Sequence, residues 1–229
     1  MEEDYCKTLL NGIDILCEND RKIDHLIGFR KEEVIRLLAR FIKEIELFNS
    51  AYGLIGTNDI KEIVIKHILD SLAPLGIILT LLNEKPPLIA DAGSGAGLPG
   101  IPLAAAMPKL NFTLIERMGR RAGFLHNTAA ILASGGITNI TVEENEFEKT
   151  KKEYFSLVAF RAFKGMDAKL LKALFNSCSN SGVIAAYKGK LETIKQEMKP
   201  LEKHCGNWEA LPYNVPFLDE ERHLLVIRK

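Results

Sequence analysis

The sequence predicts an α/β fold, with a mostly parallel sheet, a helical N-terminal extension and an antiparallel C-terminal hairpin. From Leu88 onward, short apolar runs alternate with segments of helical periodicity, which is typical of parallel strands joined by crossover helices. Before that point, apolar residues recur every three or four positions, as on the buried face of a helix. We therefore expect a helical extension over residues 1–85 and an α/β domain over residues 86–229, with Pro86-Pro87 closing the extension.

The extension is expected to contain three amphipathic helices. The first covers Asp4–Cys17. The second runs over about Lys31–Asn49, because its apolar side chains recur at spacings of three and four and so share one face. The third begins at Asn58-Asp59, which with Glu62 resembles a capping box, and continues to Leu72.

The second part is expected to alternate strands and helices up to an antiparallel hairpin at the sheet edge. The hairpin follows from two strand-like pieces that only a short loop separates, Trp208–Pro212 and Leu224–Arg228. The expected strands before it are Leu88–Ala92, Asn111–Glu116, Asn139–Val142, Phe155–Phe160 and Gly182–Lys188. The expected helices are Pro99–Met107, Met118–Ser134, Asp167–Cys178 and Leu191–His204.

Composition limits the classes of protein to which the chain can belong. Hydrophobic residues make up 47% and charged residues 26%, as in ordinary globular proteins. The longest nearly uninterrupted apolar run, Ile77–Leu82, is far shorter than the roughly 18 residues that a membrane span needs. The acidic start differs from the basic start of a signal peptide, so we expect a soluble, cytoplasmic protein with no membrane partner. The four cysteines show neither CxxC spacing nor histidines at ligand spacing, so no metal is expected.

The formal net charge is zero, but the charges are unevenly distributed. Residues 1–85 hold 11 Lys and Arg against 15 Asp and Glu, a net charge of −4. Residues 86–229 hold 19 against 15, a net charge of +4. A net charge of +4 also occurs on ordinary solvated surfaces, and it is compatible with a polyanionic partner that binds the C-terminal part.

The most informative stretch is the glycine-rich sequence DAGSGAGLPG, from Asp91 to Gly100, between the first expected strand and helix. Glycines in such a turn permit positive φ and let a ligand approach the backbone without a Cβ in the way. The helix that follows presents backbone N–H groups at the carboxyl edge of the strands. We therefore expect a ligand on this loop, at Gly93, Gly95 and Gly97.

Two cofactors suit the loop. Gly95–Gly100 satisfies GxGxxG, and Glu116 follows 21 residues after Gly95, so the dinucleotide NAD stays an alternative. S-adenosylmethionine is favoured because Asp91, two residues before Gly93, can meet the cationic methionine end of that cofactor. No separate dehydrogenase domain is visible, and the terminal hairpin is typical of the methyltransferase version of this fold. Glu116, at the end of the second strand, is expected to accept hydrogen bonds from both ribose hydroxyls.

These motifs resemble those of the bacterial small-subunit ribosomal RNA guanine-N7 methyltransferases, also called the glucose-inhibited division protein B family. The resemblance covers nearly the whole chain. It rests on the string GSGAGLPGIPLA together with the segment KHILDS before it, a combination that is more specific than either alone. Further matches are Phe48-Asn49, Leu54-Ile55, Arg161-Ala162, Lys188-Gly189 and the terminal RHLLVIRK.

The resemblance implies a Rossmann-like class I S-adenosylmethionine-dependent methyltransferase fold. It further implies transfer of the methyl group to N7 of one guanine in 16S rRNA, in the small ribosomal subunit or its precursor. Gly93 and Leu98 match cofactor-contacting positions, and Asn145-Glu146 falls beside the adenine. Arg161 matches the arginine that faces the cofactor and substrate pocket. A monomer is the default expectation for the oligomeric state.

Guanine N7 carries a lone pair and no proton, so its attack on a sulfonium methyl needs no general base. Catalysis then depends on alignment and electrostatics. We expect Arg161 first and Lys188 second to orient the base or the phosphate beside it, because arginine reads the N7 and O6 edge of guanine. An Arg161→Ala variant is expected to fold normally and lose methylation. His67 and Asp70, which share a helix face, are expected to dock the N-terminal helices.

Two functions of other classes stay open at this stage. One is an NAD-dependent oxidoreductase on a dinucleotide-binding fold, which titration with NADH against S-adenosylhomocysteine would separate from a methyltransferase. The other is a non-catalytic RNA-binding assembly factor with a degenerate pocket, whose RNA binding would not respond to the cofactor or to Gly95→Arg.

Overall fold

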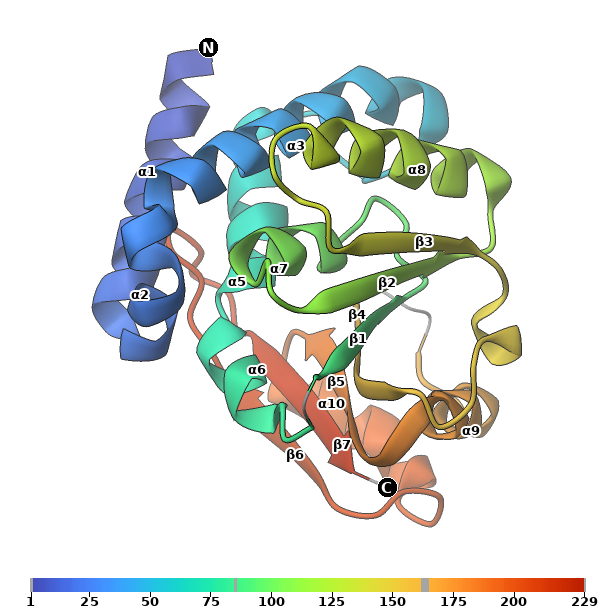
Figure 1. Ribbon diagram of the computed structural model, residues 1–229. Coiled ribbons are helices and arrows are strands. Elements are labelled where there is room, and N and C mark those ends of the chain that lie inside the picture. The colour runs from blue at the N-terminus through green and yellow to red at the C-terminus, as the bar shows by residue number, and fades with distance from the viewer. Residues whose placement is uncertain (1, 85, 162–164, 229) are drawn as a thin grey trace.

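The computed structural model describes residues 2–84, 86–161 and 165–228. Within these residues, the strands form one seven-stranded sheet in the order β3-β2-β1-β4-β5-β7-β6 (Figure 1). Neighbouring strands from β3 to β5 are parallel, whereas β7 is antiparallel to both β5 and β6. The strands are β1 (Leu88–Ala92), β2 (Asn111–Glu116), β3 (Ile140–Glu144), β4 (Phe155–Arg161), β5 (Cys178–Lys188), β6 (Trp208–Pro212) and β7 (His223–Arg228).

The expected antiparallel hairpin is present, and its second strand is inserted into the sheet. β7 pairs with β5 as well as with β6, so β6 is the edge strand. β5 begins at Cys178, earlier than the expected start at Gly182. The polar stretch after Cys178 lacks the apolar pattern of a strand, but the hydroxyls of Ser179 and Ser181 donate to the Glu84 carboxylate. Such a contact between distant residues cannot be deduced from local pattern.

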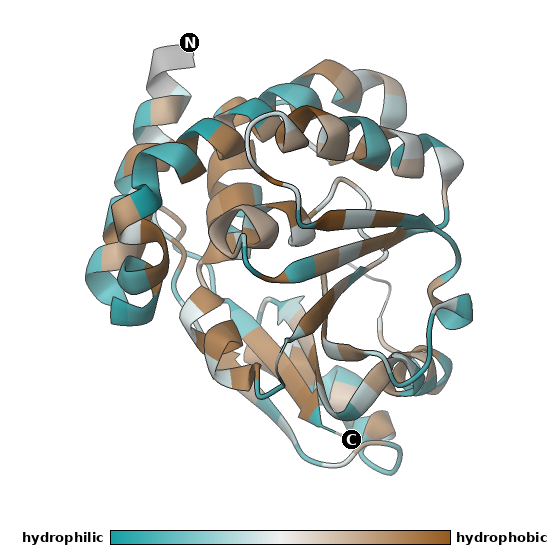
Figure 2. Ribbon diagram, in the orientation of Figure 1, coloured by the Kyte–Doolittle hydropathy of each residue, from teal (hydrophilic) through white to brown (hydrophobic). Residues whose placement is uncertain are grey.

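Side chains from the strands alternate between two separate cores, one on each face of the sheet. Ile89 and Leu157 belong to the core that the N-terminal helices share with α7 (Gly100–Ala106) and α8 (Gly119–Ala133). Ala90 and Val158 belong to the core under α9 (Ala168–Ser177) and α10 (Leu191–Met198). Figure 2 shows the hydrophobic strands between helices whose outer surfaces are hydrophilic. The expected parallel sheet with helices on both faces is confirmed.

The N-terminal region is helical, as expected, but it contains more helices than the periodicity indicated. α2 has only seven residues, too few for a periodic pattern. α6 is apolar nearly all round, so it shows no face. The helices are α1 (Glu2–Asn19), α2 (Arg21–Ile27), α3 (Lys31–Tyr52), α4 (Ile60–Ile63), α5 (Asp70–Leu72) and α6 (Leu75–Leu81), with a π-helical stretch, Val64–Leu69, between α4 and α5.

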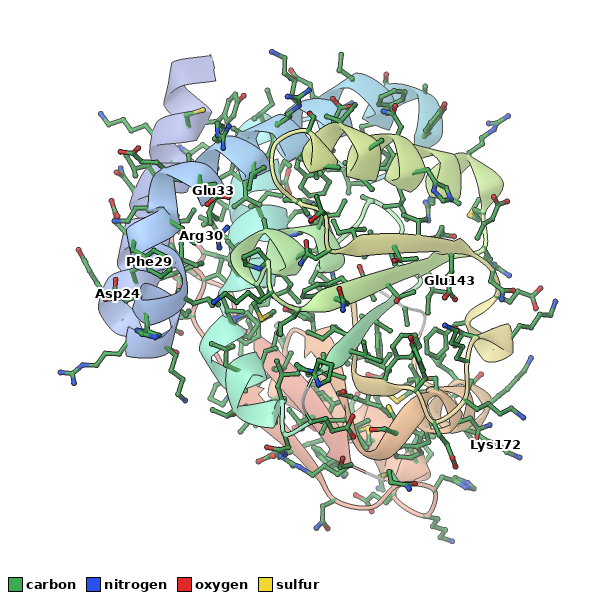
Figure 3. The ribbon with its side chains drawn as sticks, viewed as in Figure 1. Asp24, Phe29, Arg30, Glu33, Glu143 and Lys172 are labelled. Carbon is green, nitrogen blue, oxygen red and sulfur yellow. The ribbon has the colours of Figure 1, made fainter. Side chains whose placement is uncertain are left out.

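Side chains define where two of these helices begin. Asp20 caps α2 by accepting a hydrogen bond from the backbone N–H of Lys22. Asp59 caps α4 by accepting from the N–H groups of Lys61 and Glu62, so the expected start of the third helix is confirmed. The joint between α2 and α3 carries the Arg30–Glu33 ion pair at 2.9 Å, beside the exposed Phe29 (Figure 3).

The expected helix Leu191–His204 is shorter in the structure. α10 ends at Met198 and a 3-10 turn follows over Lys199–Leu201. Pro200 lies in that turn, and proline cannot supply the backbone N–H that a continuing α-helix requires. The other helices of this part begin and end within about two residues of their expected bounds.

The segment Ile60–Leu81 is long and apolar enough by composition to cross a membrane. In the structure, 61% of its most apolar window is buried. A turn at Ala73-Pro74 separates α5 from α6, and the segment packs against α1, α2 and α7. Its apolar side chains therefore belong to the protein core.

The N-terminal helices and the sheet share one hydrophobic core. Ile13 and Ile68 from the helices lie in the same cluster as Leu114 and Val226 from the sheet. Lys85, at the expected boundary, lies outside the described residues. The helical extension therefore packs on the same side of the sheet as α7 and α8, and its third helical segment reaches the carboxyl edge of β4.

Candidate functional site

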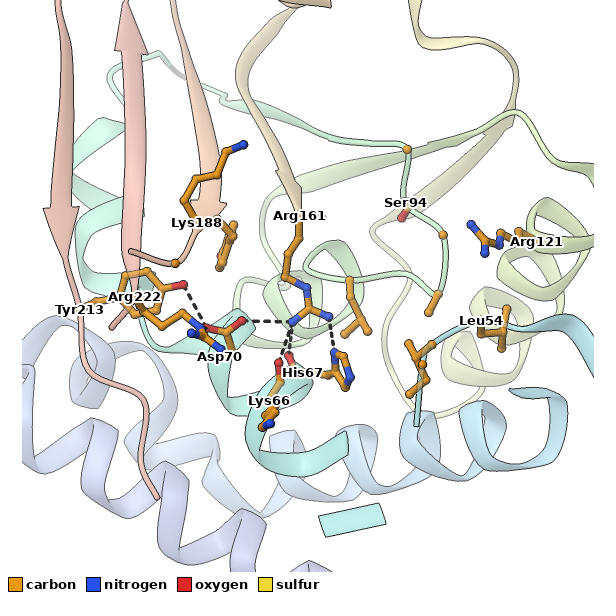
Figure 4. Close-up of a pocket in the computed structure, with 18 residues that line it drawn as sticks. Leu54, Lys66, His67, Asp70, Ser94, Arg121, Arg161, Lys188, Tyr213 and Arg222 are labelled. Carbon is orange, nitrogen blue, oxygen red and sulfur yellow. Dashed lines mark hydrogen bonds and ion pairs between the residues drawn. The ribbon is translucent and has the colours of Figure 1, made fainter. Parts of the chain in front are cut away.

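A cavity of about 620 Å³ lies at the carboxyl edge of the parallel strands, next to the N-terminal helices (Figure 4). This edge, where the strand order reverses, is where open α/β sheets bind ligands. β1 contributes the glycine loop, β4 contributes Arg161 and β5 contributes Lys188. The lining residues are Leu54, Ile55, Gly56, Lys66, His67, Asp70, Gly93, Ser94, Gly95, Ala96, Leu98, Arg121, Arg161, Tyr187, Lys188, Gly189, Tyr213 and Arg222.

The glycine loop has the backbone that its sequence predicts. Gly93, Gly95 and Gly97 have φ values of 65°, 56° and 85°. A Cβ added at Gly95 would meet no atom closer than 3.8 Å, so this glycine borders open space. A Cβ at Gly97 would lie 2.4 Å from the side chain of Ile101, so that glycine is required by packing inside the loop. Gly95 therefore lines the cavity without a side chain, and Gly97 allows the loop to close on α7.

Asp91 is buried beneath the loop and does not line the cavity. One carboxylate oxygen, Oδ2, accepts hydrogen bonds from the Ser94 hydroxyl (2.6 Å) and the Gly100 backbone N–H (2.9 Å). Burial raises the pKa of Asp91 to about 6, although these two hydrogen bonds act in the opposite direction. Asp91 thus joins the two ends of the loop, and its contact with the methionine end of a cofactor stays a prediction.

Glu116 ends β2 and supports the glycine loop from the side. Its Oε2 accepts from the Gly95 N–H (2.9 Å) and its Oε1 from the Met118 N–H (2.8 Å). Each carboxylate oxygen can accept a second hydrogen bond, so the predicted ribose contacts are compatible with these bonds. Asn145 lies against the same residue, because its N–H donates to the Glu116 carbonyl (3.1 Å).

The structure divides the predicted site residues into two groups. The residues that line the cavity are Gly93, Gly95, Leu98, Arg161 and Lys188. The residues that lie beneath or beside it are Asp91, Gly97, Glu116, Asn145 and Glu146. In the second group Glu146 is exposed and pairs with Lys149 at 3.0 Å, and its predicted place beside the adenine stays a prediction.

Arg161 does not pair with Asp91; its guanidinium binds the N-terminal helices. Its Nη2 lies 2.7 Å from Nδ1 of His67. Its Nη1 donates to the carbonyl oxygen of Lys66 (3.0 Å) and to Oδ2 of Asp70 (3.2 Å). Because a guanidinium only donates, Nδ1 of His67 accepts, and the ring proton of the neutral imidazole lies on Nε2. Arg161→Ala removes one of the partners of the buried Asp70 carboxylate, so we expect it to lower stability, and whether the variant folds normally stays a prediction.

Asp70 is the centre of this network. Besides Arg161, it binds the Tyr213 hydroxyl at 3.0 Å and Nε of Arg222 at 3.5 Å. Burial raises the pKa of Asp70, while the two guanidinium groups and the Tyr213 hydroxyl act in the opposite direction. The contacts of Asp70 and His67 join the helical extension to the sheet, which confirms their expected docking role. Both side chains also line the cavity.

Sequence reasoning did not select Lys66, Arg121, Tyr213 or Arg222 as site residues, although all four line the cavity. Arg121, near the start of α8, donates from Nη2 to the Gly53 carbonyl at 3.0 Å. Lys66 and Arg222 could have been selected from the sequence, because they begin KHILDS and RHLLVIRK, two of the segments on which the resemblance rests. The basic side chains that line the cavity are Lys66, Arg121, Arg161, Lys188 and Arg222, and the acidic one is Asp70.

His67 is expected to make the protein less stable in acid. Burial first, and then the Arg161 cation, lowers the pKa of His67 from 6.5 to about 4. Between pH 4 and pH 6.5, His67 binds a proton more readily in the unfolded state than in the folded state. The contribution of neutral His67 to the free energy of unfolding is therefore fully present above pH 6.5 and is lost as the pH falls towards 4. The full difference corresponds to roughly 3 kcal/mol.

Urea unfolding of the protein and of His67→Gln at pH 7 and pH 4.5 measures this effect. Glutamine can still accept from Arg161 but does not titrate. Stability should therefore fall more steeply with acid in the unmodified protein than in the variant. The same loss in both proteins would show that His67 is not the group responsible.

The site has the features that S-adenosylmethionine requires. Two buried polar atoms beside the cavity, Oδ1 of Asp91 and Nε of Arg121, have no hydrogen-bond partner among the described residues. Gly95 lines the cavity and has no side chain, so its backbone is accessible to a ligand there. Across residues 2–84, 86–161 and 165–228, no group of three or more His, Cys, Asp or Glu side chains is placed to hold a metal ion.

Comparison with known proteins gives the family. A family model described as rRNA small subunit methyltransferase G matches residues 34–225. The ribosomal RNA small subunit methyltransferase G of Treponema denticola is 34% identical over 221 residues, which cover 85% of this chain and 86% of that protein. The protein of the same name from Treponema pallidum is 36% identical over 211 residues, 90% of each chain.

A solved structure agrees on the fold. The magnesium protoporphyrin IX methyltransferase of Synechocystis, with bound S-adenosylmethionine, superposes with a TM-score of 0.54 at 13% identity over 82% of this chain and 97% of that one. The expected Rossmann-like class I methyltransferase fold is thereby confirmed, and the matching family of methyltransferases agrees with the expected S-adenosylmethionine cofactor. With a glycine loop, a basic cavity and relatives of this kind, the chain belongs to the rRNA small subunit methyltransferase G family of S-adenosylmethionine-dependent enzymes.

Proposed function

We propose that this protein transfers the methyl group of S-adenosylmethionine to N7 of one guanine in 16S rRNA, in the small ribosomal subunit or its precursor. The observation that carries the proposal is the cavity itself, where the glycine loop and five basic side chains meet at one sheet edge. The cationic lining suits the phosphates of an RNA substrate. The two alternatives, an NAD-dependent oxidoreductase and a non-catalytic assembly factor, find no support in the comparisons.

The cofactor belongs at the glycine-loop end of the cavity. Gly93, Gly95 and Leu98 would hold it from the loop, with Glu116 and Asn145-Glu146 on the side of the adenosine. The bound cofactor supplies an activated methyl group on a sulfonium. The backbone of the loop would fix the position of the cofactor, because Asp91 and Glu116 hold the loop through two backbone N–H groups and one hydroxyl.

The substrate belongs at the other end, beside Arg161 and Lys188. Because guanine N7 has no proton to lose, these residues act by position and charge. Arg161 is held by His67 and Asp70, so its cation is fixed at the end of β4. Lys188 is oriented by Glu197 at 2.8 Å. Side chains held in this way can keep the base, or the phosphate beside it, aligned with the methyl group, so these residues would contribute by positioning.

We place this reaction in the cytoplasm, in a monomer without a resident metal. Residues 86–229 form the methyltransferase domain, and residues 1–85 form its helical extension. The extension is part of the site, because it contributes Leu54, Lys66, His67 and Asp70 to the wall of the cavity.

Incubation with radiolabelled S-adenosylmethionine and undermethylated small ribosomal subunits tests the proposal. We expect label in 16S rRNA. In a separate titration, we expect the protein to bind S-adenosylhomocysteine and not NADH. Subunits that are already methylated serve as the control and should take up no label. A protein that binds S-adenosylhomocysteine but leaves undermethylated 16S rRNA unlabelled would refute the assigned substrate.

A further inference from the structure

An exposed carboxylate bridges two cations of the cavity wall. Glu220, in the loop between β6 and β7, lies with Oε1 3.4 Å from Nζ of Lys66 and with Oε2 2.9 Å from Nη2 of Arg222. Lys66 comes from the helical extension, and Arg222 immediately precedes β7. Both cations line the cavity, whereas Glu220 does not. One acidic group thus sits between two basic groups that come from distant parts of the chain.

These two cations lie at the end of the cavity away from the cofactor loop. Along the carboxyl edge of the sheet, the glycine loop follows β1, Arg161 ends β4 and Lys188 ends β5. Because β7 is antiparallel, its first residues reach the same edge beyond β5, and they carry Arg222 there. Figure 4 shows Lys66 and Arg222 on the opposite side of Arg161 from Ser94 and Arg121.

We propose that Lys66 and Arg222 form the seat for a phosphate group of the RNA strand, and that Glu220 occupies this seat in the RNA-free protein. This inference rests on the proposed function. A phosphate offers two anionic oxygens to two donors, as the carboxylate of Glu220 does here. RNA binding therefore exchanges one anion for another at the same pair of cations.

The contacts around the seat suit such an exchange. Glu220 is about half exposed, with 47% of its side-chain surface accessible, and exposed ion pairs contribute little to stability. Arg222 is only 18% exposed and is held from behind by Asp70 at 3.5 Å, so it stays in place when Glu220 leaves. Lys66 keeps a second partner, Glu62, at 3.3 Å on its own helix. The cations are thus pre-organised and the carboxylate is replaceable.

The seat is tested by the affinity of variants for undermethylated small ribosomal subunits at several salt concentrations. Lys66→Gln should weaken binding by roughly five- to tenfold and reduce the dependence of log affinity on log salt by about 0.7–0.9. Glu220→Gln should strengthen binding by about two- to fivefold, because the RNA no longer displaces a carboxylate. When Lys66→Gln is added to Glu220→Gln, the affinity for subunits should fall by at least the same factor as when Lys66→Gln is made in the unmodified protein.

The surface pair of Glu209 and Arg228 supplies matched controls. Arg228 ends β7 at the opposite edge of the sheet, and it pairs with Glu209 on β6. Glu209→Gln makes the same change in charge as Glu220→Gln, and we expect it to leave the affinity unchanged. If Glu209→Gln strengthens binding as much as Glu220→Gln does, the effect is one of overall charge and the seat does not exist.

The unmodified protein separates this inference from the proposed function. If it transfers no methyl group to 16S rRNA, the proposed function fails, whatever the variants do. If it is active but Lys66→Gln binds subunits as tightly as the unmodified protein, only the phosphate seat is overturned. Binding of S-adenosylhomocysteine by each variant shows that the cofactor end of the cavity has remained folded.

Discussion

Gly95→Arg is expected to abolish methyl transfer while the protein remains folded. The glycine lines the cavity and an added Cβ would meet no atom closer than 3.8 Å, so the new side chain would extend to where we propose that the cofactor binds. Its φ of 56° adds a modest backbone strain for a residue with a Cβ. We expect a loss of at least about 100-fold in methyl transfer, since displacing a reactant by about 1 Å already has an effect of that size. Calorimetric titration with S-adenosylhomocysteine should show no binding.

Gly136→Arg is the matched control for this substitution. Gly136 also has a positive φ, 112°, but it lies between α8 and β3, at the edge of the sheet away from the cavity. An added Cβ there meets no atom closer than 3.6 Å. The control should carry a larger backbone strain than Gly95→Arg, because its φ of 112° lies outside the left-handed region that residues with a Cβ adopt, and it should still keep its methyl transfer activity. Full activity of Gly95→Arg would show that the cofactor does not lie against this loop.

Asp70→Ala is expected to cause the largest loss of stability of any change described here. The carboxylate is the shared partner of two guanidinium groups and of the Tyr213 hydroxyl. Removing one partner from a buried ion pair leaves an uncompensated charge and costs about 3–5 kcal/mol. Because Asp70 joins the helical extension to the sheet, urea unfolding should report this loss for the whole protein.

Glu209→Gln provides the comparison for Asp70→Ala. Both side chains of the Glu209–Arg228 pair are nearly half exposed. Losing this pair should therefore lower the free energy of unfolding by no more than about 1 kcal/mol. An equally small loss for Asp70→Ala would mean that solvent replaces the carboxylate and that the network does not hold the two parts together.

Much of the fold could be predicted from the sequence because local pattern determines it. β2 occupies Asn111–Glu116 in the structure, the range that its apolar run predicts. The glycine loop lies between β1 and α7 because glycine adopts positive φ values at little cost, and three glycines there do so. The helix α6 could not be predicted, since a segment that is apolar on all sides has no periodicity.

The site was less accessible to prediction, because its contacts join distant parts of the chain. Arg161 was expected at the end of β4, but its partners His67 and Asp70 precede it by more than 90 residues. Asp91 was expected to meet the methionine end of the cofactor; one of its carboxylate oxygens binds Ser94 and Gly100 inside the loop, which the sequence did not indicate, and the cofactor contact stays a prediction. The direction of a side chain at a strand end depends on the packed loop, which local sequence does not specify.

We assign to the cavity the methylation of N7 of one guanine in 16S rRNA. The most direct test is to incubate the protein with S-adenosylmethionine and undermethylated small subunits, digest the 16S rRNA to nucleosides and identify the product by mass spectrometry. We predict that 7-methylguanosine appears in a stoichiometry of about one per subunit and is absent with Gly95→Arg. A methylated nucleoside other than 7-methylguanosine, or none, would contradict the account.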